Sequence, residues 1–541
     1  MENWRTMRHS DRPVYPETLE DQEKALLSDP QLEDFKRIRR DKKDEPYRPV
    51  YHFIRPDGTL NDPNGLCFWE GRWHLFYQAL DPCIHWGHAV SDDMIYWRDL
   101  PYAISPGDEA HCFSGGTCVD EENHRVIAAY YGFTGYDPET GYKHGIVIAT
   151  SSDPLLLNWT KVKDGAPVIP DGDAPCWTPP DAPPVKDQKP YQVFDSYIWK
   201  ENGVYYLLTA GYTPDPVTGR RHRQVYLHRC TDDGLTDWEF VKPLLERDHF
   251  REPGDDGACP YFIPIGDGKR LFIHFSHRCA PKYLIGDYDP ETLDFVPFSG
   301  ARLTSGYQVM VAPSAFPCGN GEANCIFNMM EQRGHNGWGG VMTLPRRLFV
   351  GGVWNDELYQ KPFADLSVLH ESTVEYTDVK LETGVPFIPE DMQSNAFEMS
   401  FDLKADGIPQ TLEIEVLRSA DGRERTRISF FRFKGGMYAI LPYCSDSVIM
   451  LDTTCSSLEG ATQLPPETAP VVMSNQDDLN IRIFVDKSIV EVFVNDRHCI
   501  QQRAYPTLPD STGVSVLARC GEGCVSNLRF HTMKSIWTYE E

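Results

Sequence analysis

Carboxylate and hydroxyl side chains occur at the starts of several strand-like segments that are far apart in the sequence. The motifs are NDPNG at 61–65, FSG at 113–115, FDS at 194–196 and DDGACP at 255–260. Two carboxylates about 5 to 5.5 Å apart can hydrolyse a glycosidic bond with retention, because one attacks the anomeric carbon and the other protonates the leaving oxygen. A third carboxylate can bind sugar hydroxyls. This chemistry requires a fold that brings the strand starts together.

A repeated strand pattern predicts such a fold. Five segments each consist of a strand, a turn and a second, more apolar strand, at 65–77, 115–131, 197–208, 259–275 and 314–330. Recurrence every ~50 to 80 residues is typical of antiparallel propeller blades. In a propeller the innermost strands run beside one central channel, so residues at their starts converge. We therefore predict an all-β protein with a five-bladed β-propeller catalytic domain at residues 48–365.

Different patterns flank this region. Residues 1–47 are charged and contain helix-like runs, which predicts a short helical N-terminal extension. Beyond residue 363, strands alternate with polar turns, a pattern typical of a β-sandwich. We place the sandwich at 382–541 and a linker at 366–381.

The amino-acid composition limits the classes of molecule that the protein can bind. The chain has 80 acidic and 52 basic residues and a formal net charge of -28, which disfavours nucleic acid and anionic membrane surfaces and suits a neutral substrate. No segment resembles a secretory signal or a membrane span, and the 15 cysteines lack zinc-type spacing. We expect a cytoplasmic protein with mostly reduced thiols, no metal and no cofactor. The extension and the sandwich both offer surfaces for a homo-oligomer, so the oligomeric state stays open.

The motif at 61–65 resembles the signature of glycoside hydrolase family 32, which contains invertases, inulinases and levanases. Segments at 71–78, 85–91, 113–115, 337–348 and 485–506 resemble further motifs of that family, in the same order. The resemblance covers roughly residues 48–535. It implies a retaining β-fructofuranosidase that acts on a small carbohydrate such as sucrose or a fructo-oligosaccharide.

The resemblance also implies roles for individual residues. Asp62 would be the nucleophile and Asp195 the transition-state stabiliser. Asn61 and Gln78 would bind fructosyl hydroxyls, whereas the sugar-binding pocket would be lined by Trp86, Phe113 and Ser114. A plain core position is the alternative for Trp86. The nearby His85 and His88 should lie on opposite faces of a strand, so we expect no metal site there.

The chain departs from the family pattern at two motifs. Phe194-Asp195-Ser196 stands where the family has Arg-Asp-Pro, and Ala258-Cys259-Pro260 stands where Glu-Cys-Pro supplies the acid/base. Side chains along a strand alternate between faces, so Asp256 should project on the same side as Ala258, and Gly257 permits the bend that this requires. We predict that Asp256 is the acid/base. Glu252 and Glu331 are the alternatives.

Three functional hypotheses follow from these residues. The first is hydrolysis of terminal fructosyl units, and the second is fructosyl transfer, in which a sugar hydroxyl replaces water. The third is a catalytically weak fructan-binding propeller that has lost its acid. The sequence leaves these open, together with the preference among sucrose, inulin and levan.

Overall fold

The computed structural model describes residues 4–134, 136–137, 141–142, 144–171, 192–214, 221–246, 249–252, 255–278, 280–304, 309–330, 338–432, 446–459 and 465–537. Strands dominate these residues, and two α-helices precede the first strand. The predicted mostly β structure is confirmed.

Five antiparallel sheets succeed one another between residues 58 and 362 of the described chain. The first contains β1 (Gly58–Trp69), β2 (Arg72–Leu80), β3 (Ile84–Ser91) and β4 (Arg98–Ile104), with β22 (Trp338–Gly339) parallel to β1. The second contains β5 (His111–Asp120), β6 (Arg125–Phe133), β9 (Gly145–Ser151) and β10 (Thr160–Lys161), with β11 (Ile169–Pro170) also on β9. A separate hairpin pairs β7 (Tyr136–Asp137) with β8 (Gly141–Tyr142).

The remaining three sheets repeat this order. The third contains β12 (Gln192–Glu201), β13 (Val204–Pro214), β14 (Arg221–Cys230) and β15 (Trp238–Pro243). The fourth contains β16 (Ala258–Pro264), β17 (Lys269–Phe275), β18 (Lys282–Asp289) and β19 (Asp294–Arg302). The fifth contains β20 (Met310–Pro317), β21 (Glu322–Met329), β24 (Arg346–Gly351) and β25 (Glu357–Pro362), with β23 (Val341–Met342) on β21.

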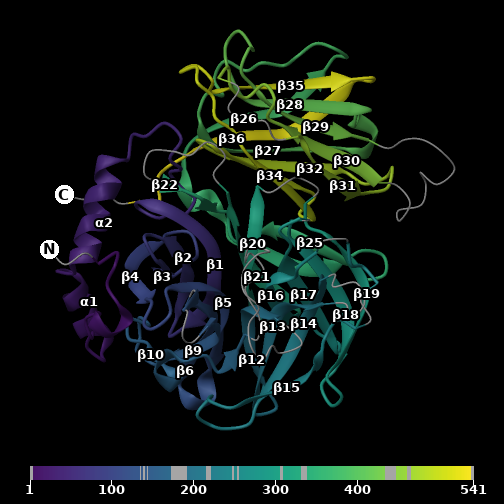
Figure 1. The fold of residues 1–541 in the computed structure, drawn as a ribbon. Coiled ribbons are helices and arrows are strands. Elements are labelled where there is room, and N and C mark those ends of the chain that lie inside the picture. Colours follow the sequence, from purple (N-terminus) through teal and green to yellow (C-terminus); the bar gives the residue numbers. More distant parts are fainter. Residues whose placement is uncertain are drawn as a thin grey trace.

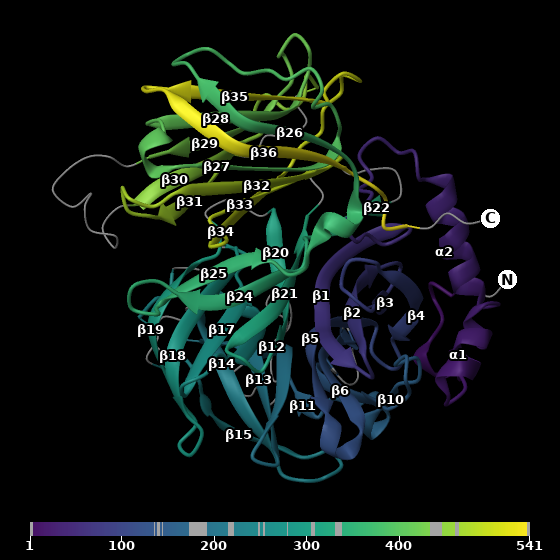
Figure 2. The same cartoon turned by 180° about the vertical axis from the view of Figure 1, so that it is seen from behind.

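The first strands of the five sheets contact one another in a ring. The contacts run from β1 to β5, β12, β16 and β20 and then back to β1. The parallel pairing of β22 with β1 brings the chain after the fifth sheet back to the first. Figures 1 and 2 show these sheets together as one body, with the C-terminal sheets stacked on one side of it. The starts of the first strands are therefore neighbours in space.

The C-terminal region forms two sheets around a shared apolar core. The six-stranded sheet contains β26 (His370–Leu381), β36 (Gly523–Met533), β27 (Ala396–Leu403), β32 (Leu479–Asp486), β33 (Ile489–Val494) and β34 (His498–Arg503). The five-stranded sheet contains β31 (Glu467–Val472), β30 (Asp446–Asp452), β29 (Thr426–Phe431), β28 (Thr411–Arg418) and β35 (Gly513–Arg519). Phe401 and Ile483 of one sheet and Ile414 and Ile428 of the other belong to one buried cluster, as in a β-sandwich.

The predicted linker at 366–381 differs from the structure. Leu366–Leu369 forms a short 3-10 helix, η4, and the chain then enters β26, which pairs with β36. Val374 and Tyr376 alternate along β26 and pack against the sandwich core. Because the apolar side chains of this segment have a place in that core, residues from His370 onward belong to the sandwich.

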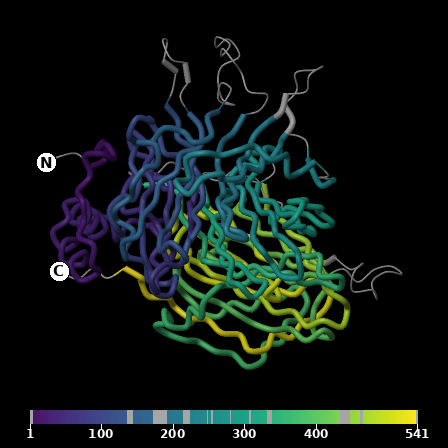
Figure 3. Tube along the Cα trace, turned by 90° about the horizontal axis from the view of Figure 1, so that it is seen from below, coloured from purple at the N-terminus to yellow at the C-terminus, as the bar shows by residue number. Residues whose placement is uncertain are grey.

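The N-terminal helices pack against the outside of the first sheet, as Figures 1 and 3 show. Asp29 caps α2 (Pro30–Asp41) by accepting a hydrogen bond from the backbone N of Leu32 at 3.0 Å, and α1 (Leu19–Leu26) lies before it. Arg39 of α2 pairs with Asp99 at 2.6 Å and lies over the ring of Trp537. Among the described helices, none combines the length and apolar character needed to cross a membrane.

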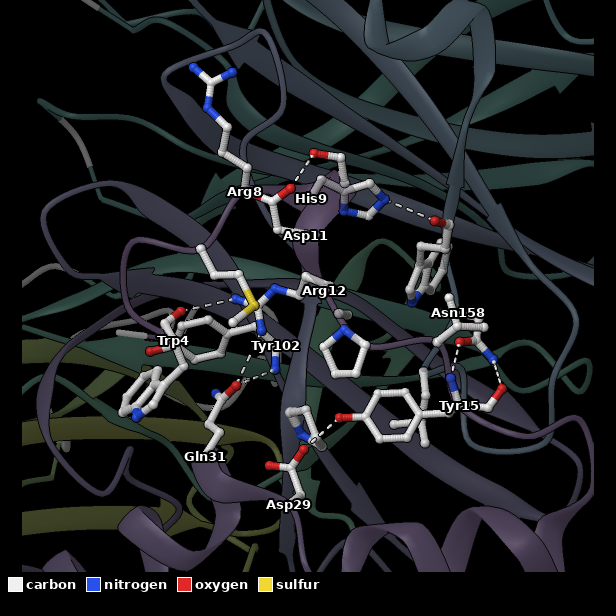
Figure 4. Close-up of a pocket in the computed structure, with 18 of the residues that line it drawn as sticks. Trp4, Arg8, His9, Asp11, Arg12, Tyr15, Asp29, Gln31, Tyr102 and Asn158 are labelled. Carbon is white, nitrogen blue, oxygen red and sulfur yellow. Dashed lines mark hydrogen bonds between the residues drawn. The ribbon is translucent and has the colours of Figure 1, made fainter. Parts of the chain in front are cut away.

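The segment before these helices and α2 together line an open cavity of 1370 Å³ against the first two sheets (Figure 4). Its walls are tied together by polar contacts, such as Tyr15 Oη to Asp29 at 2.6 Å and Arg12 Nη1 to Gln31 at 3.2 Å. Asp62, Asp195 and Asp256 line no part of this cavity. The predicted chemistry must therefore lie elsewhere.

One buried carboxylate joins the C-terminal sheets to the chain segment that precedes the first strand of the ring. Asp486, at the end of β32, accepts hydrogen bonds from the backbone N of Val50 at 2.7 Å, Tyr51 at 2.8 Å and His52 at 2.9 Å. Its side chain is 0% exposed. These bonds fix the chain segment that leads into β1, and β1 carries Asn61 and Asp62.

We predict that Asp486→Ala lowers the free energy of unfolding by about 3 kcal/mol or more, because three buried N–H groups lose their acceptor. The thermal midpoint measures the change. The control is Glu375→Ala, which removes an exposed pair with Arg529 and should leave the midpoint nearly unchanged. Equal shifts for the two variants would contradict this role of Asp486.

Candidate active site

A β-bulge interrupts the start of the first strand in each of the five sheets. The register shifts lie between Leu60 and Pro63, Cys112 and Gly115, Phe194 and Ser196, Ala258 and Tyr261, and Met310 and Pro313. A bulge leaves residues out of the ladder and re-aims their side chains. The predicted residues Asn61, Asp62, Phe113, Ser114 and Asp195 all lie within these bulges. The ring thus presents them at one place.

Two of the bulges contain strained backbone. Asp195 has a φ of 34° and Cys259 a φ of 48°, in the left-handed region that non-glycine residues rarely adopt. Each such residue costs on the order of 1 kcal/mol, and it persists only where its surroundings hold it in place. The strained positions coincide with the meeting point of the carboxylates.

Asp62 lies in a network of polar side chains. Its Oδ2 accepts hydrogen bonds from Ser114 Oγ at 2.6 Å and Gln78 Nε2 at 3.1 Å. Asn61 Nδ2 donates to Gln78 Oε1 at 3.1 Å, and Asn328 Nδ2 donates to Asn61 Oδ1 at 3.2 Å. Gln78 and Ser114 are buried, whereas Asp62 and Asn61 are partly exposed. The network orients Asp62 and leaves part of it open to solvent.

The structure brings Asp195 and Asp62 to the same thiol. Asp195 Oδ2 accepts hydrogen bonds from Cys259 N at 3.0 Å and Cys259 Sγ at 3.4 Å. The same Sγ lies 3.6 Å from Asp62 Oδ2. Burial, and secondly the negative charge of Asp62, raise the pKa of Asp195 to about 6. Burial also raises the pKa of Asp62, although the Ser114 hydrogen bond acts against it.

Asp256 contacts a histidine of the neighbouring strand end. Its Oδ1 accepts a hydrogen bond from the backbone N of His277 at 3.2 Å, and its Oδ2 is hydrogen-bonded to His277 Nδ1. Gly257 has a φ of 67° and supplies the bend that the sequence predicted. Asp255 points elsewhere, to Lys282 Nζ at 2.8 Å and Arg223 Nη1 at 2.9 Å. The two adjacent aspartates therefore have different surroundings.

The alternative acids have different fates. Glu252 pairs with Lys282 at 3.1 Å and with Arg302, and the Arg302 hydrogen bond is the main cause that lowers the pKa of Glu252 to about 2. A carboxyl group with that pKa holds no proton near neutral pH. Glu331 lies outside the described residues.

Trp86 occupies the core rather than the surface of the site. Its side chain is 0% exposed, and its Nε1 donates to the backbone oxygen of Phe113 at 2.9 Å. The ring packs near Phe76 and Tyr130. A fully buried ring has no face to offer a sugar, so the predicted direct contact is not part of this arrangement. Trp86 instead supports Phe113, which is partly exposed.

The structure also reveals residues that the sequence reasoning missed. Cys259 links the two carboxylates, Asn328 reaches Asn61, and His277 contacts Asp256. The pairing of Ala258 with Phe275 in the β16–β17 hairpin places residue 277 opposite residue 256, so the hairpin register was the available signal for His277. Within the described part of the chain, no cluster of three His, Cys, Asp or Glu residues could hold a metal ion.

Comparison with known proteins places these features in a family. Residues 52–362 match the model of the N-terminal domain of glycosyl hydrolases family 32, and residues 365–532 match the model of its C-terminal domain. A fructan 6-exohydrolase from Beta vulgaris is 26% identical, with 86% of this chain and 82% of that protein covered. A sucrose-6-phosphate hydrolase from Zymomonas mobilis is 27% identical, with 85% and 87% covered. The crystal structure of fructan 1-exohydrolase IIa from Cichorium intybus has a TM-score of 0.74 at 22% identity, with 91% and 98% covered, and shows the same fold.

The raised pKa of Asp195 generates a stability prediction. A carboxyl group whose folded pKa lies above its ordinary value of 3.8 stabilises the fold below that value, and this contribution is lost as the pH rises through about 6. We predict that Asp195→Asn, which keeps an acceptor for Cys259, stabilises the protein at pH 7.5 by roughly 1 to 3 kcal/mol and has little effect at about pH 4.

Thermal midpoints of the variant and the parent at both pH values measure this difference. Asp92→Asn is the control, because the Asp92 side chain is 86% exposed and should respond at neither pH. A lower thermal midpoint of Asp195→Asn at pH 7.5 would show that the charge of Asp195 does not destabilise the fold.

Proposed function

Since the chain belongs to glycoside hydrolase family 32 and is a glycoside hydrolase, we propose that it releases terminal β-linked fructosyl units from sucrose or short fructans with retention of configuration. The observation that carries this proposal is the meeting of Asp62 and Asp195 at Cys259. Relatives named fructan 6-exohydrolase and sucrose-6-phosphate hydrolase support a fructosyl substrate.

We also infer that the five sheets are the blades of a β-propeller. The closed ring of first strands and the bulge at each strand start support this reading. The catalytic domain would then span residues 48–365, after an N-terminal extension at 1–47. The substrate would enter at the bulged end, where Asp62 and Phe113 are partly exposed.

Asp62 is the proposed nucleophile. Its carboxylate attacks the anomeric carbon and forms a covalent fructosyl ester, which water later hydrolyses. Ser114 and Gln78 hold the carboxylate in one orientation, so little reorganisation is needed before attack. Ser114 is bonded to Asp62 and is the chain neighbour of Phe113, so we propose that the fructosyl ring lies beside these three residues.

Asp195 is the proposed transition-state stabiliser. A buried negative charge beside the anomeric centre favours the oxocarbenium-like transition state over the neutral ground state. Asn61 and Gln78 are placed to bind fructosyl hydroxyls, since both have amide groups beside Asp62. The Phe194 that precedes Asp195 takes the place of an arginine in the family pattern, so this chain binds its sugar without that cation.

We propose that the acid/base function lies in the hydrogen-bonded pair of Asp256 and His277. Asp256 is the acid/base that the sequence predicts, and its carboxylate is hydrogen-bonded to the backbone N and to the ring of His277. Position 258 cannot supply the acid, because Ala258 has no carboxylate.

A cytoplasmic location stays a prediction, as does any homo-oligomer. The 12 described cysteines are free thiols, as a reducing compartment would keep them.

We predict that Asp62→Asn removes turnover of sucrose by about three orders of magnitude or more while the fold stays intact, because an amide cannot form the ester. The assay measures fructose, glucose and longer products on sucrose, inulin and levan in parallel, with near-ultraviolet circular dichroism to check folding. Asp92→Asn is again the matched control and should keep full activity.

The product pattern separates the three candidate functions. Free fructose from the parent protein and none from Asp62→Asn supports hydrolysis. Longer fructosyl products with little free fructose indicate transfer to a sugar. Binding of inulin without turnover, unchanged by Asp62→Asn, would contradict the proposal and favour a binding protein.

A further inference from the structure

We propose that His277 is the proton-transfer residue of this site, which protonates the departing oxygen and later deprotonates water, and that Asp256 is its positioning residue. The inference rests on the proposed fructosyl hydrolysis and names the group that replaces the missing acid. The acid must come from another residue, because the methyl group of Ala258 can neither donate nor accept a proton.

The β16–β17 hairpin places the imidazole of His277 near the start of β16, where Ala258 lies. Ala258 is the cross-strand partner of Phe275, so residues 256 and 277 face each other two positions beyond that pair. Both the backbone N and the ring Nδ1 of His277 are hydrogen-bonded to Asp256. The ring also packs edge-on against Phe275, with centroids 5.0 Å apart. These contacts define the position of the ring.

The same strand start connects His277 to the reacting carboxylates. Cys259, three residues after Asp256, touches both Asp62 and Asp195. The charges of Asp195 and Asp62 both act on His277. The exposed fractions then distinguish the two members of the pair, because the His277 side chain is 72% exposed and that of Asp256 is 8% exposed. A leaving group that departs toward solvent meets the imidazole before it meets the carboxylate.

The charges around His277 favour a ring that is protonated at rest and that releases its proton during the reaction. The hydrogen bond to Asp256 raises the pKa of His277 to about 9, and the charges of Asp195 and Asp62 add to this. The imidazolium is therefore charged in the resting site. Formation of the ester removes the negative charge of Asp62, so the pKa of His277 falls as the glycosidic bond breaks. The lower pKa makes His277 a better acid in the first step, and the pKa rises again as hydrolysis restores the charge of Asp62, which favours proton uptake in the second step.

The two steps balance. In the first, an oxygen of Asp62 bonds to the anomeric carbon, the glycosidic electron pair moves to the leaving oxygen, and that oxygen takes the proton from Nε2 of His277. Nδ1 stays hydrogen-bonded to Asp256. In the second, water bonds to the anomeric carbon and gives a proton to Nε2, and the ester electron pair returns to Asp62.

Chemical rescue tests this assignment. The variants are His277→Ala, His277→Gln and Asp256→Asn, with His124→Ala as a control because His124 is exposed and lies on the turn between β5 and β6. The substrates are sucrose and an aryl β-fructofuranoside whose phenol leaves without protonation. Each is assayed with and without azide, which needs no general base to attack the ester. Thermal midpoints check that each variant is folded.

We expect both His277 variants to lose sucrose turnover by about 100-fold or more. They should still release the phenol rapidly in the first turnover, and azide should accelerate later turnovers and give the β-fructosyl azide. The alkaline limb of kcat/KM on sucrose, which reports the His277 pKa, should disappear. Asp256→Asn should keep more activity and move this limb to lower pH, because the imidazolium loses its counter-charge. His124→Ala should match the parent protein.

Other outcomes overturn the assignment in different ways. Normal sucrose activity in the His277 variants, with the rescue pattern in Asp256→Asn, would make Asp256 itself the acid. Folded His277 variants that lose both substrates equally and ignore azide would show a positioning role only. A parent protein that cleaves the aryl fructoside but not sucrose would show that no acid operates, whereas cleavage of neither would remove the proposed hydrolysis itself.

Discussion

Repulsion between the buried carboxylate of Asp195 and the partly exposed carboxylate of Asp62 is the constraint around which this site is organised. Asp62 and Asp195 approach the same Cys259 thiol, and burial and their mutual charge raise the pKa of Asp195 to about 6. Two such groups would separate in a flexible protein. The strained backbone at Asp195 and Cys259 and the hydrogen bonds from Ser114 and Gln78 hold them together. Carboxylates with shifted pKa values are common at catalytic sites.

The rest of the fold supplies the rigidity that this arrangement needs. Each first strand presents its side chains from a bulge and packs against the first strands of the two neighbouring sheets. The C-terminal sheets reinforce the ring from one side. Asp486 holds the segment that leads into β1, and the buried Arg346 of β24 donates to Gln501 of β34 at 2.8 Å. The sandwich therefore contributes to the site without contributing a residue to it.

Sequence reasoning reached the parts of the structure that local chemistry determines. Strand and turn patterns predicted the mostly β structure, and the motifs around Asp62, Ser114 and Asp195 identified residues that the structure brings together. It failed where the answer depends on packing or register. The strand character of 370–381 became clear only from its pairing with β36. The buried position of Trp86 depends on neighbours from another sheet, and His277 depends on the register of a hairpin.

The proposed reaction passes through a fructosyl ester on Asp62, and this ester can be trapped. The parent protein is mixed with sucrose, quenched in acid within one turnover and digested with pepsin, and its peptides are analysed by mass spectrometry. We expect one fructosyl unit on the peptide that contains Asp62, and mild base should remove it because it is an ester. Release of fructose with no adduct, or an adduct on the peptide that contains Asp195, would contradict it.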